Sequence, residues 1–204
     1  MAPPVGLVIG HSFVQGLQQH LDPTNQATPS DFARKLSLEK IVQKFHIHGH
    51  RGACITSKSY SLPHRLLTQS KPDFAILDLG SNDLASRVAP LQVATALIEL
   101  ADVLRHRYHI RTIMVCSIVN RKAHLKDITP EEFQTAAYET NNYLQNYADS
   151  HPHITYHVHK GFWAHPIDSW SRDGVHPNTP AGRTKYIKSI RKAVFLALQT
   201  FTSK

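Results

Sequence analysis

A serine near the amino end of the chain and an Asp–His pair near its carboxyl end have the residue types needed for nucleophilic catalysis. Ser12 follows a glycine after an apolar run. Asp173 precedes His176 by three residues. A serine hydroxyl is a weak nucleophile unless a neighbouring base accepts its proton. Within one turn, Asp173 can bind His176 Nδ1 and leave Nε2 free to be that base.

Each of these signals also has a purely structural explanation. Serine is common at helix N-caps, so Ser12 at a strand-to-helix turn can simply cap the helix that follows. An Asp-x-x-His sequence such as that of Asp173 and His176 also fits an ordinary surface turn. Only their combination, in places that one fold brings together, favours a catalytic site.

Two further residues can stabilise the negative charge that develops on a carbonyl oxygen. The side-chain amide of Asn82 can donate a hydrogen bond to an oxyanion. Gly52 leaves its backbone N–H unshielded, and Gly49 is the alternative donor in the same segment. Asparagine and glycine are also frequent in plain turns, which is the competing interpretation.

Apolar runs alternate with helical patterns along the chain, which indicates a parallel sheet covered by helices. We expect strands at residues 5–9, 44–48, 74–79, 112–119 and 154–158. A capping box at Thr129–Glu132 predicts the start of a helix that ends near Asp149. In open parallel sheets, sites lie beyond the carboxyl ends of the strands. All the candidate residues follow predicted strands, so they can meet at one edge of the sheet.

Length and composition are those of one globular domain, which we place at residues 1–204. The chain is 41% hydrophobic and 19% charged. It has no apolar run of the roughly 20 residues that span a bilayer, and no signal-peptide pattern at its start. We therefore expect an intracellular, cytoplasmic location. The first strand begins within a few residues of Met1, as in a domain excised from a longer protein.

Cysteine and histidine usage gives no metal signature. Cys54 and Cys116 stand among apolar residues without a C-x-x-C motif, which indicates reduced thiols. Although His46, His48 and His50 alternate as on one face of a strand, no carboxylate or cysteine completes a ligand set. We therefore expect neither a metal nor a cofactor.

In this order, the motifs resemble those of the SGNH or GDSL hydrolase superfamily over nearly the whole chain. The first two blocks are Ile9-Gly10-His11-Ser12 and Gly49-His50-Arg51-Gly52-Ala53. The more specific third and fifth blocks are Leu79-Gly80-Ser81-Asn82-Asp83 and Asp173-Gly174-Val175-His176-Pro177. The resemblance implies a three-layer α/β/α sandwich with a flavodoxin-like five-stranded parallel sheet, order 2-1-3-4-5. It also implies a serine ester hydrolase that forms an acyl-enzyme.

The resemblance assigns a role to each matching position. Ser12 is the nucleophile, His176 the base, and Asp173 the residue that orients His176. The oxyanion hole is formed by the Ser12 N–H, the Gly52 N–H and the Asn82 side chain.

The first block departs from the family pattern, which usually reads Gly-Asp-Ser. His11 takes the place of that aspartate and puts a titratable group beside the nucleophile. We count it as a possible pocket residue together with Trp163, Trp170 and Arg172, which precede or flank the Asp–His turn. Packing of that loop is an equally good explanation for the two tryptophans.

Because no long insertion can form a lid or a deep tunnel, we expect short acyl groups, acetyl above all. The alcohol half of the ester can be a sugar, a lipid headgroup or another group.

A binding module on the same fold is the alternative function. The formal net charge is +8, and the last helix concentrates basic residues that can contact RNA or an anionic membrane: Arg183, Lys185, Lys188, Arg191 and Lys192. A solvated helix face explains them equally. Similar esterase domains occur in some retroelement first-open-reading-frame proteins, where the setting is nucleic-acid binding.

Overall fold

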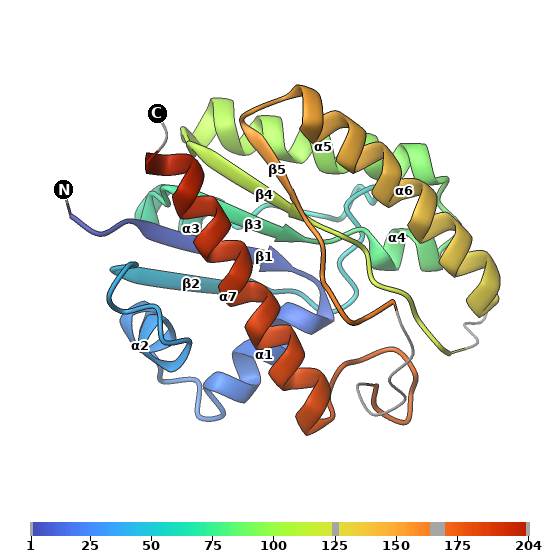
Figure 1. The fold of residues 1–204 in the computed structure, drawn as a ribbon, viewed down its shortest axis with the longest axis horizontal. Helices are drawn as coiled ribbons and strands as arrows, with labels where there is room; N and C mark the ends of the chain where they lie inside the picture. The colour runs from blue at the N-terminus through green and yellow to red at the C-terminus, as the bar shows by residue number, and fades with distance from the viewer. Residues whose placement is uncertain (1, 124–126, 164–169, 203–204) are drawn as a thin grey trace.

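The computed structural model describes residues 2–123, 127–163 and 170–202. Within these residues, five parallel strands form one sheet: β1 (Val5–Gly10), β2 (Lys44–Gly49), β3 (Phe74–Asp78), β4 (Thr112–Cys116) and β5 (Ile154–His157). Their order is β2-β1-β3-β4-β5 (Figure 1). The strand order predicted from the sequence is therefore confirmed.

Helices cover both faces of the sheet (Figure 1). One face carries α1 (Ser12–Leu21), α2 (Pro29–Lys35) and α7 (Pro180–Thr202). The other carries α3 (His64–Ser70), α4 (Ser81–Ala85), α5 (Pro90–Tyr108) and α6 (Pro130–Ser150). Successive strand residues point to opposite faces, so Val8 packs in the first core while Leu7 and Ile9 pack in the second. This is the three-layer sandwich that the sequence predicted.

The capping box at the start of α6 forms as expected. Thr129 Oγ1 accepts from the Glu132 N–H at 3.2 Å, and Glu132 Oε2 accepts from the Thr129 N–H at 2.9 Å. A second capping box, between Thr28 and Asp31, opens α2. Local side-chain chemistry thus sets where these helices begin.

Apart from the fourth strand, the strand ends differ by one residue from the prediction, and two larger differences shape the site. The fourth strand ends at Cys116 and not at residue 119, because the Asn141 side chain takes both backbone groups of Ile118. The segment after β3 is the short helix α4, where a loop was expected. Gly80 makes that turn with φ +95, in the left-handed region that favours glycine.

Among the described residues, no helix is long and apolar enough to cross a membrane. On α7, Lys188 and Lys192 are exposed, whereas Arg183, Lys185 and Arg191 are half-buried. Contact of this helix with nucleic acid or with a membrane stays a prediction.

Candidate active site

The structure joins Ser12, His176 and Asp173 in one hydrogen-bonded chain. Ser12 is the first residue of α1, directly beyond the carboxyl end of β1. Its Oγ lies 2.9 Å from His176 Nε2, and His176 Nδ1 lies 2.7 Å from Asp173 Oδ2. A serine hydroxyl that donates to Nε2 while Nδ1–H donates to a carboxylate is the arrangement of a Ser–His–Asp triad.

Asp173 is held ionised by its own loop. Its Oδ1 accepts from the Ser171 hydroxyl at 2.6 Å and from the backbone N–H groups of Val175 and His176 at 2.8 and 3.0 Å. Burial alone favours the neutral acid, but these bonds and the His176 ring hold the pKa of Asp173 well below its usual range. The carboxylate therefore remains available to orient His176.

The loop that carries Asp173 and His176 is packed against the loop that follows β4. The carbonyl of Gly174 accepts from the Lys122 N–H at 2.8 Å. Gly174 has φ +63, and a Cβ there would lie 2.8 Å from Ala123 N. Only glycine fits this close approach without strain.

His11, and not Ser12, is the N-cap of α1. His11 Nδ1 accepts from the Phe13 N–H at 3.4 Å, which leaves the Ser12 hydroxyl free for His176. The His11 ring is only 2% exposed, and its Nε2 lies 3.7 Å from Asp78 Oδ1. The structure therefore places His11 beneath the nucleophile and not in the pocket where we had counted it.

We expect this buried imidazole to make the fold acid-sensitive. Burial lowers the pKa of His11 to about 4, although the Asp78 carboxylate opposes the shift. Between about pH 6.5 and pH 4, the unfolded chain binds a proton that the folded chain does not, so stability falls as the pH falls. Burial likewise lowers the pKa of His157 to about 4.

Thermal melts between pH 7.5 and pH 4.5 measure this effect. The melting temperature of the wild type is expected to fall, and that of His11→Asn to fall less steeply. Asparagine keeps an N-capping oxygen but cannot titrate. Equal slopes for the two proteins would show that His11 is not the responsible group.

Asn82 is bonded to the turn that carries Gly52. Asn82 lies in the first turn of α4, and its Nδ2 donates to the carbonyl of Ala53, the residue after Gly52, at 3.1 Å. The Ser12 N–H, at the start of α1, has no partner within its helix. Packing explains why position 49 is glycine, because a Cβ on Gly49 would lie 2.1 Å from Gln15 N. This packing constraint favours Gly52, with φ +73, as the second backbone donor.

Arg121 is a site residue that the sequence did not reveal. It is 4% exposed, lies over the Phe133 ring, and donates from Nη2 to Asn82 Oδ1 at 2.9 Å. With Ala53 accepting from Nδ2, only one orientation of the amide satisfies both partners, because a flip would oppose N–H to N–H and O to O. Burial lowers the pKa of Arg121 to about 10, so it remains a cation at neutral pH.

The loop after the fourth strand carries no motif, so the sequence does not single out Arg121. Its only signal is a polar run, Asn120-Arg121-Lys122, a few residues beyond a buried strand. Asn141 on α6 holds that loop by its two bonds to Ile118, at 2.8 and 2.9 Å. This long-range clamp cannot be read from local sequence.

Substitution of Asn82 tests the oxyanion hole. Asn82→Ala is expected to lower kcat on p-nitrophenyl acetate by about 10²–10³-fold with little change in KM, because the hydrogen bond from the Asn82 amide to the carbonyl oxygen forms only as negative charge develops there.

Arg121→Met is expected to lower kcat by about tenfold. If Arg121 acts through Asn82, it has little further effect in the double variant. If the fold loss in kcat of the double variant equals the product of the two single losses, Arg121 does not act through Asn82.

The remaining pocket candidates are Trp170, Trp163 and Arg172. Trp170 is 6% exposed and packs on Phe13 and Phe162, with ring centroids at 6.1 and 5.8 Å. Trp163 is half-buried against the core on the other face of the sheet. Arg172 is exposed. Both tryptophans thus pack against other side chains, and their place in a pocket stays a prediction, since residues 164–169 of their loop lie outside the described part.

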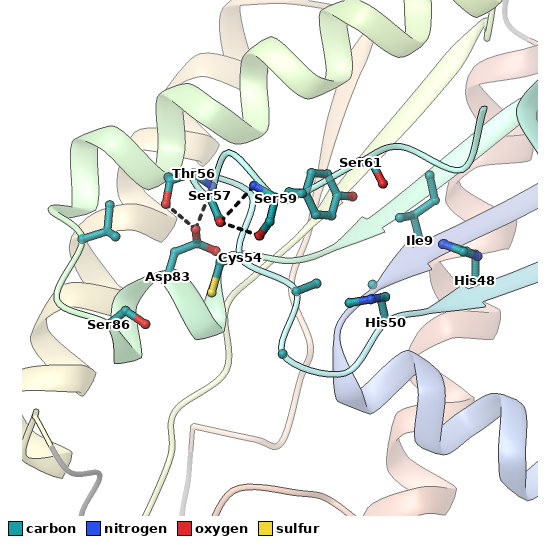
Figure 2. A pocket seen from close by; sticks show the side chains of 15 residues that line it. Ile9, His48, His50, Cys54, Thr56, Ser57, Ser59, Ser61, Asp83 and Ser86 are labelled. Carbon is teal, nitrogen blue, oxygen red and sulfur yellow. Dashed lines mark hydrogen bonds between the residues drawn. The ribbon is translucent and has the colours of Figure 1, made fainter.

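Two cavities border the turn that follows β2. One, of about 270 Å³, is lined by Ser12, His176, Asp173 and Arg51. The other, of about 370 Å³, is bordered by Gly52. Figure 2 shows Ile9, His48 and His50 on one side of this second cavity and Asp83 and Ser86 on the other.

Comparisons with solved structures show the same fold in known proteins. Similar solved structures include a GDSL-like lipase from Bacteroides thetaiotaomicron, with TM-score 0.63, 16% identity, and coverage of 95% of this chain and 89% of that one. An acetyl-xylooligosaccharide esterase mutant from a Geobacillus species has TM-score 0.67 and 13% identity, and covers 94% of each chain. An acetyl esterase mutant with an acetate ion has TM-score 0.61 and 16% identity, covering 96% of this chain and 98% of that one.

The family comparison is more specific than these structural likenesses. No curated protein sequence matches the chain. The model of the GDSL-like lipase/acylhydrolase family matches residues 8–182, a span that includes Ser12, Asn82, Asp173 and His176. This match covers most of the chain, and its members are ester hydrolases, as the sequence motifs predicted. The chain therefore belongs to the GDSL-like lipase/acylhydrolase family.

Proposed function

We propose that this protein hydrolyses carboxylic esters of short acyl groups, acetyl above all, through an acyl-enzyme on Ser12. The observation that carries the proposal is the hydrogen-bonded chain from Ser12 Oγ through His176 to Asp173, at 2.9 and 2.7 Å. A nucleophile, a base and an orienting carboxylate within hydrogen-bond distance form the minimum set for acyl transfer.

The reaction proceeds in two halves. Ser12 Oγ attacks the ester carbonyl while His176 Nε2 accepts the hydroxyl proton. The negative charge on the carbonyl oxygen is stabilised by the N–H groups of Ser12 and Gly52 and by the Asn82 amide. When the tetrahedral intermediate collapses, the ester C–O bond breaks and His176 returns the proton to the leaving alcohol. Water then attacks the acyl-serine in the same way and releases the carboxylic acid.

The cavity that borders Gly52 supports a small acyl group. Hydroxyl groups of Thr56, Ser57, Ser59 and Ser61 line it together with apolar groups such as those of Ile9 and Val88. A long aliphatic chain gains stability only by covering continuous apolar surface, which this mixed lining does not offer. Two of the similar structures are, by their names, esterases of acetyl groups.

Hydrolysis of p-nitrophenyl acetate, butyrate and octanoate tests the proposal. The kcat/KM is expected to be highest for acetate and at least tenfold lower for octanoate. Labelling with a fluorophosphonate, followed by peptide mass spectrometry, is expected to find the adduct on Ser12. Absence of turnover on all three esters, or a preference for octanoate, would overturn the proposal.

A further inference from the structure

A row of amide side chains extends along α1 from the nucleophile. Ser12, Gln15 and Gln19 are spaced i, i+3 and i+7, so they share one face of the helix. Gln15 and Gln19 line the cavity of about 270 Å³ that holds Ser12 and His176. They also line an adjoining cavity of about 340 Å³, which continues to Gln18 and Asn25. We call these two joined cavities the α1 groove.

The alcohol half of an ester must lie in this groove during catalysis. His176 Nε2 returns its proton to the leaving oxygen, so that oxygen has to sit next to the imidazole. His176 itself lines the α1 groove, together with Asn178. The groove therefore contacts the part of the substrate that departs first.

The lining of the α1 groove suits a neutral, polar group. Of the described side chains that line it, Pro23 alone is apolar, so an alkyl chain finds no surface to cover. One cation, Arg51, is offset by the carboxylates of Asp173 and Asp22. Neither a lipid tail nor an anionic headgroup matches this set of groups.

The amides of the α1 groove are also unused by the protein. Within the described part of the chain, the side chains of Gln15, Gln19 and Asn178 make no hydrogen bond to another residue. Each primary amide offers donors and an acceptor together, which is the pattern that hydroxyl groups match. A row of such groups can therefore bind several hydroxyls at once.

We propose that the α1 groove binds the leaving alcohol and that this alcohol is a sugar, with room for a second sugar unit beyond Gln19. The inference rests on the proposed function, because it names the substrate class of the same site. Gln15 and Gln19 act as specificity-determining residues, and Asn178 makes a further contact with the sugar.

The test compares two acetate esters of similar length, 6-O-acetylglucose and hexyl acetate. Acetate release is measured for the wild type, the double variant Gln15→Leu/Gln19→Leu and the control Gln145→Leu on the exposed face of α6. The wild type is expected to show at least a tenfold higher kcat/KM on 6-O-acetylglucose. The double variant is expected to lower that ratio about tenfold, as for the loss of two hydrogen bonds, and the control to keep it.

Several outcomes overturn the inference. These are an equal or higher wild-type kcat/KM on hexyl acetate, a ratio that the double variant does not lower, or a preference for 1-acetylglycerol 3-phosphate, which would indicate an anionic alcohol. If p-nitrophenyl acetate is hydrolysed in each case, the esterase function stands and only the sugar assignment fails. If no ester is hydrolysed, the proposed function itself fails.

Discussion

Ser12→Ala is expected to lower kcat on p-nitrophenyl acetate by about 10⁴-fold or more, down to the little that binding and the oxyanion hole alone supply. The reason is chemical, because without Oγ no acyl-enzyme forms and His176 has no hydroxyl to deprotonate. Alanine fits the first position of a helix whose cap is His11, so the variant is expected to fold. The measurement is steady-state turnover, with circular dichroism as the check on folding.

A matched serine substitution separates this effect from a general loss of stability. Ser30→Ala removes an exposed hydroxyl near the start of α2, far along the chain from the site. It is expected to leave turnover unchanged. A folded Ser12→Ala protein that keeps more than a tenth of the wild-type kcat would show that Ser12 is not the nucleophile.

Asp173→Asn is expected to lower kcat by about 10³–10⁴-fold, the second-largest effect in this molecule. Asparagine has the shape of aspartate, but its amide can present an N–H to His176 Nδ1 and so favour the wrong tautomer. Nε2 would then carry the proton and could no longer accept one from Ser12, from which it lies 2.9 Å away.

The pH profile distinguishes this cause from a displaced loop. Hydroxide can take the hydroxyl proton of Ser12 in place of a misoriented base, so raising the pH is expected to restore part of the Asp173→Asn activity if the loop is intact. Asp149→Asn, at the exposed end of α6, is the control with the same change of charge. A drop in activity for both variants, or no drop for Asp173→Asn, would contradict the assignment.

The fold was predictable because its signals are local or periodic. The alternation of apolar runs and amphipathic segments predicts the five strands, and a capping box marks the start of α6. The third and fifth motifs predict where Asn82 and His176 lie, because residues that follow parallel strands collect at one edge of the sheet.

The parts that escaped prediction depend on contacts between distant residues. The bond from Arg121 to Asn82 spans 39 positions, and the clamp from Asn141 to Ile118 spans 23. His11 is the position at which the first block departs from the family motif, and its burial against Asp78 is set by packing and not by that motif. Sequence patterns show which residues can do chemistry, whereas contacts between distant residues decide which of those side chains face the catalytic site.

The bond from the Lys122 N–H to the Gly174 carbonyl, at 2.8 Å, has a consequence for how the site opens and closes. Arg121 orients the oxyanion amide and is the neighbour of Lys122, while Gly174 lies between Asp173 and His176. Because this bond joins the two loops, we expect a local opening event that breaks it to disturb the proton-transfer residues and the oxyanion amide together.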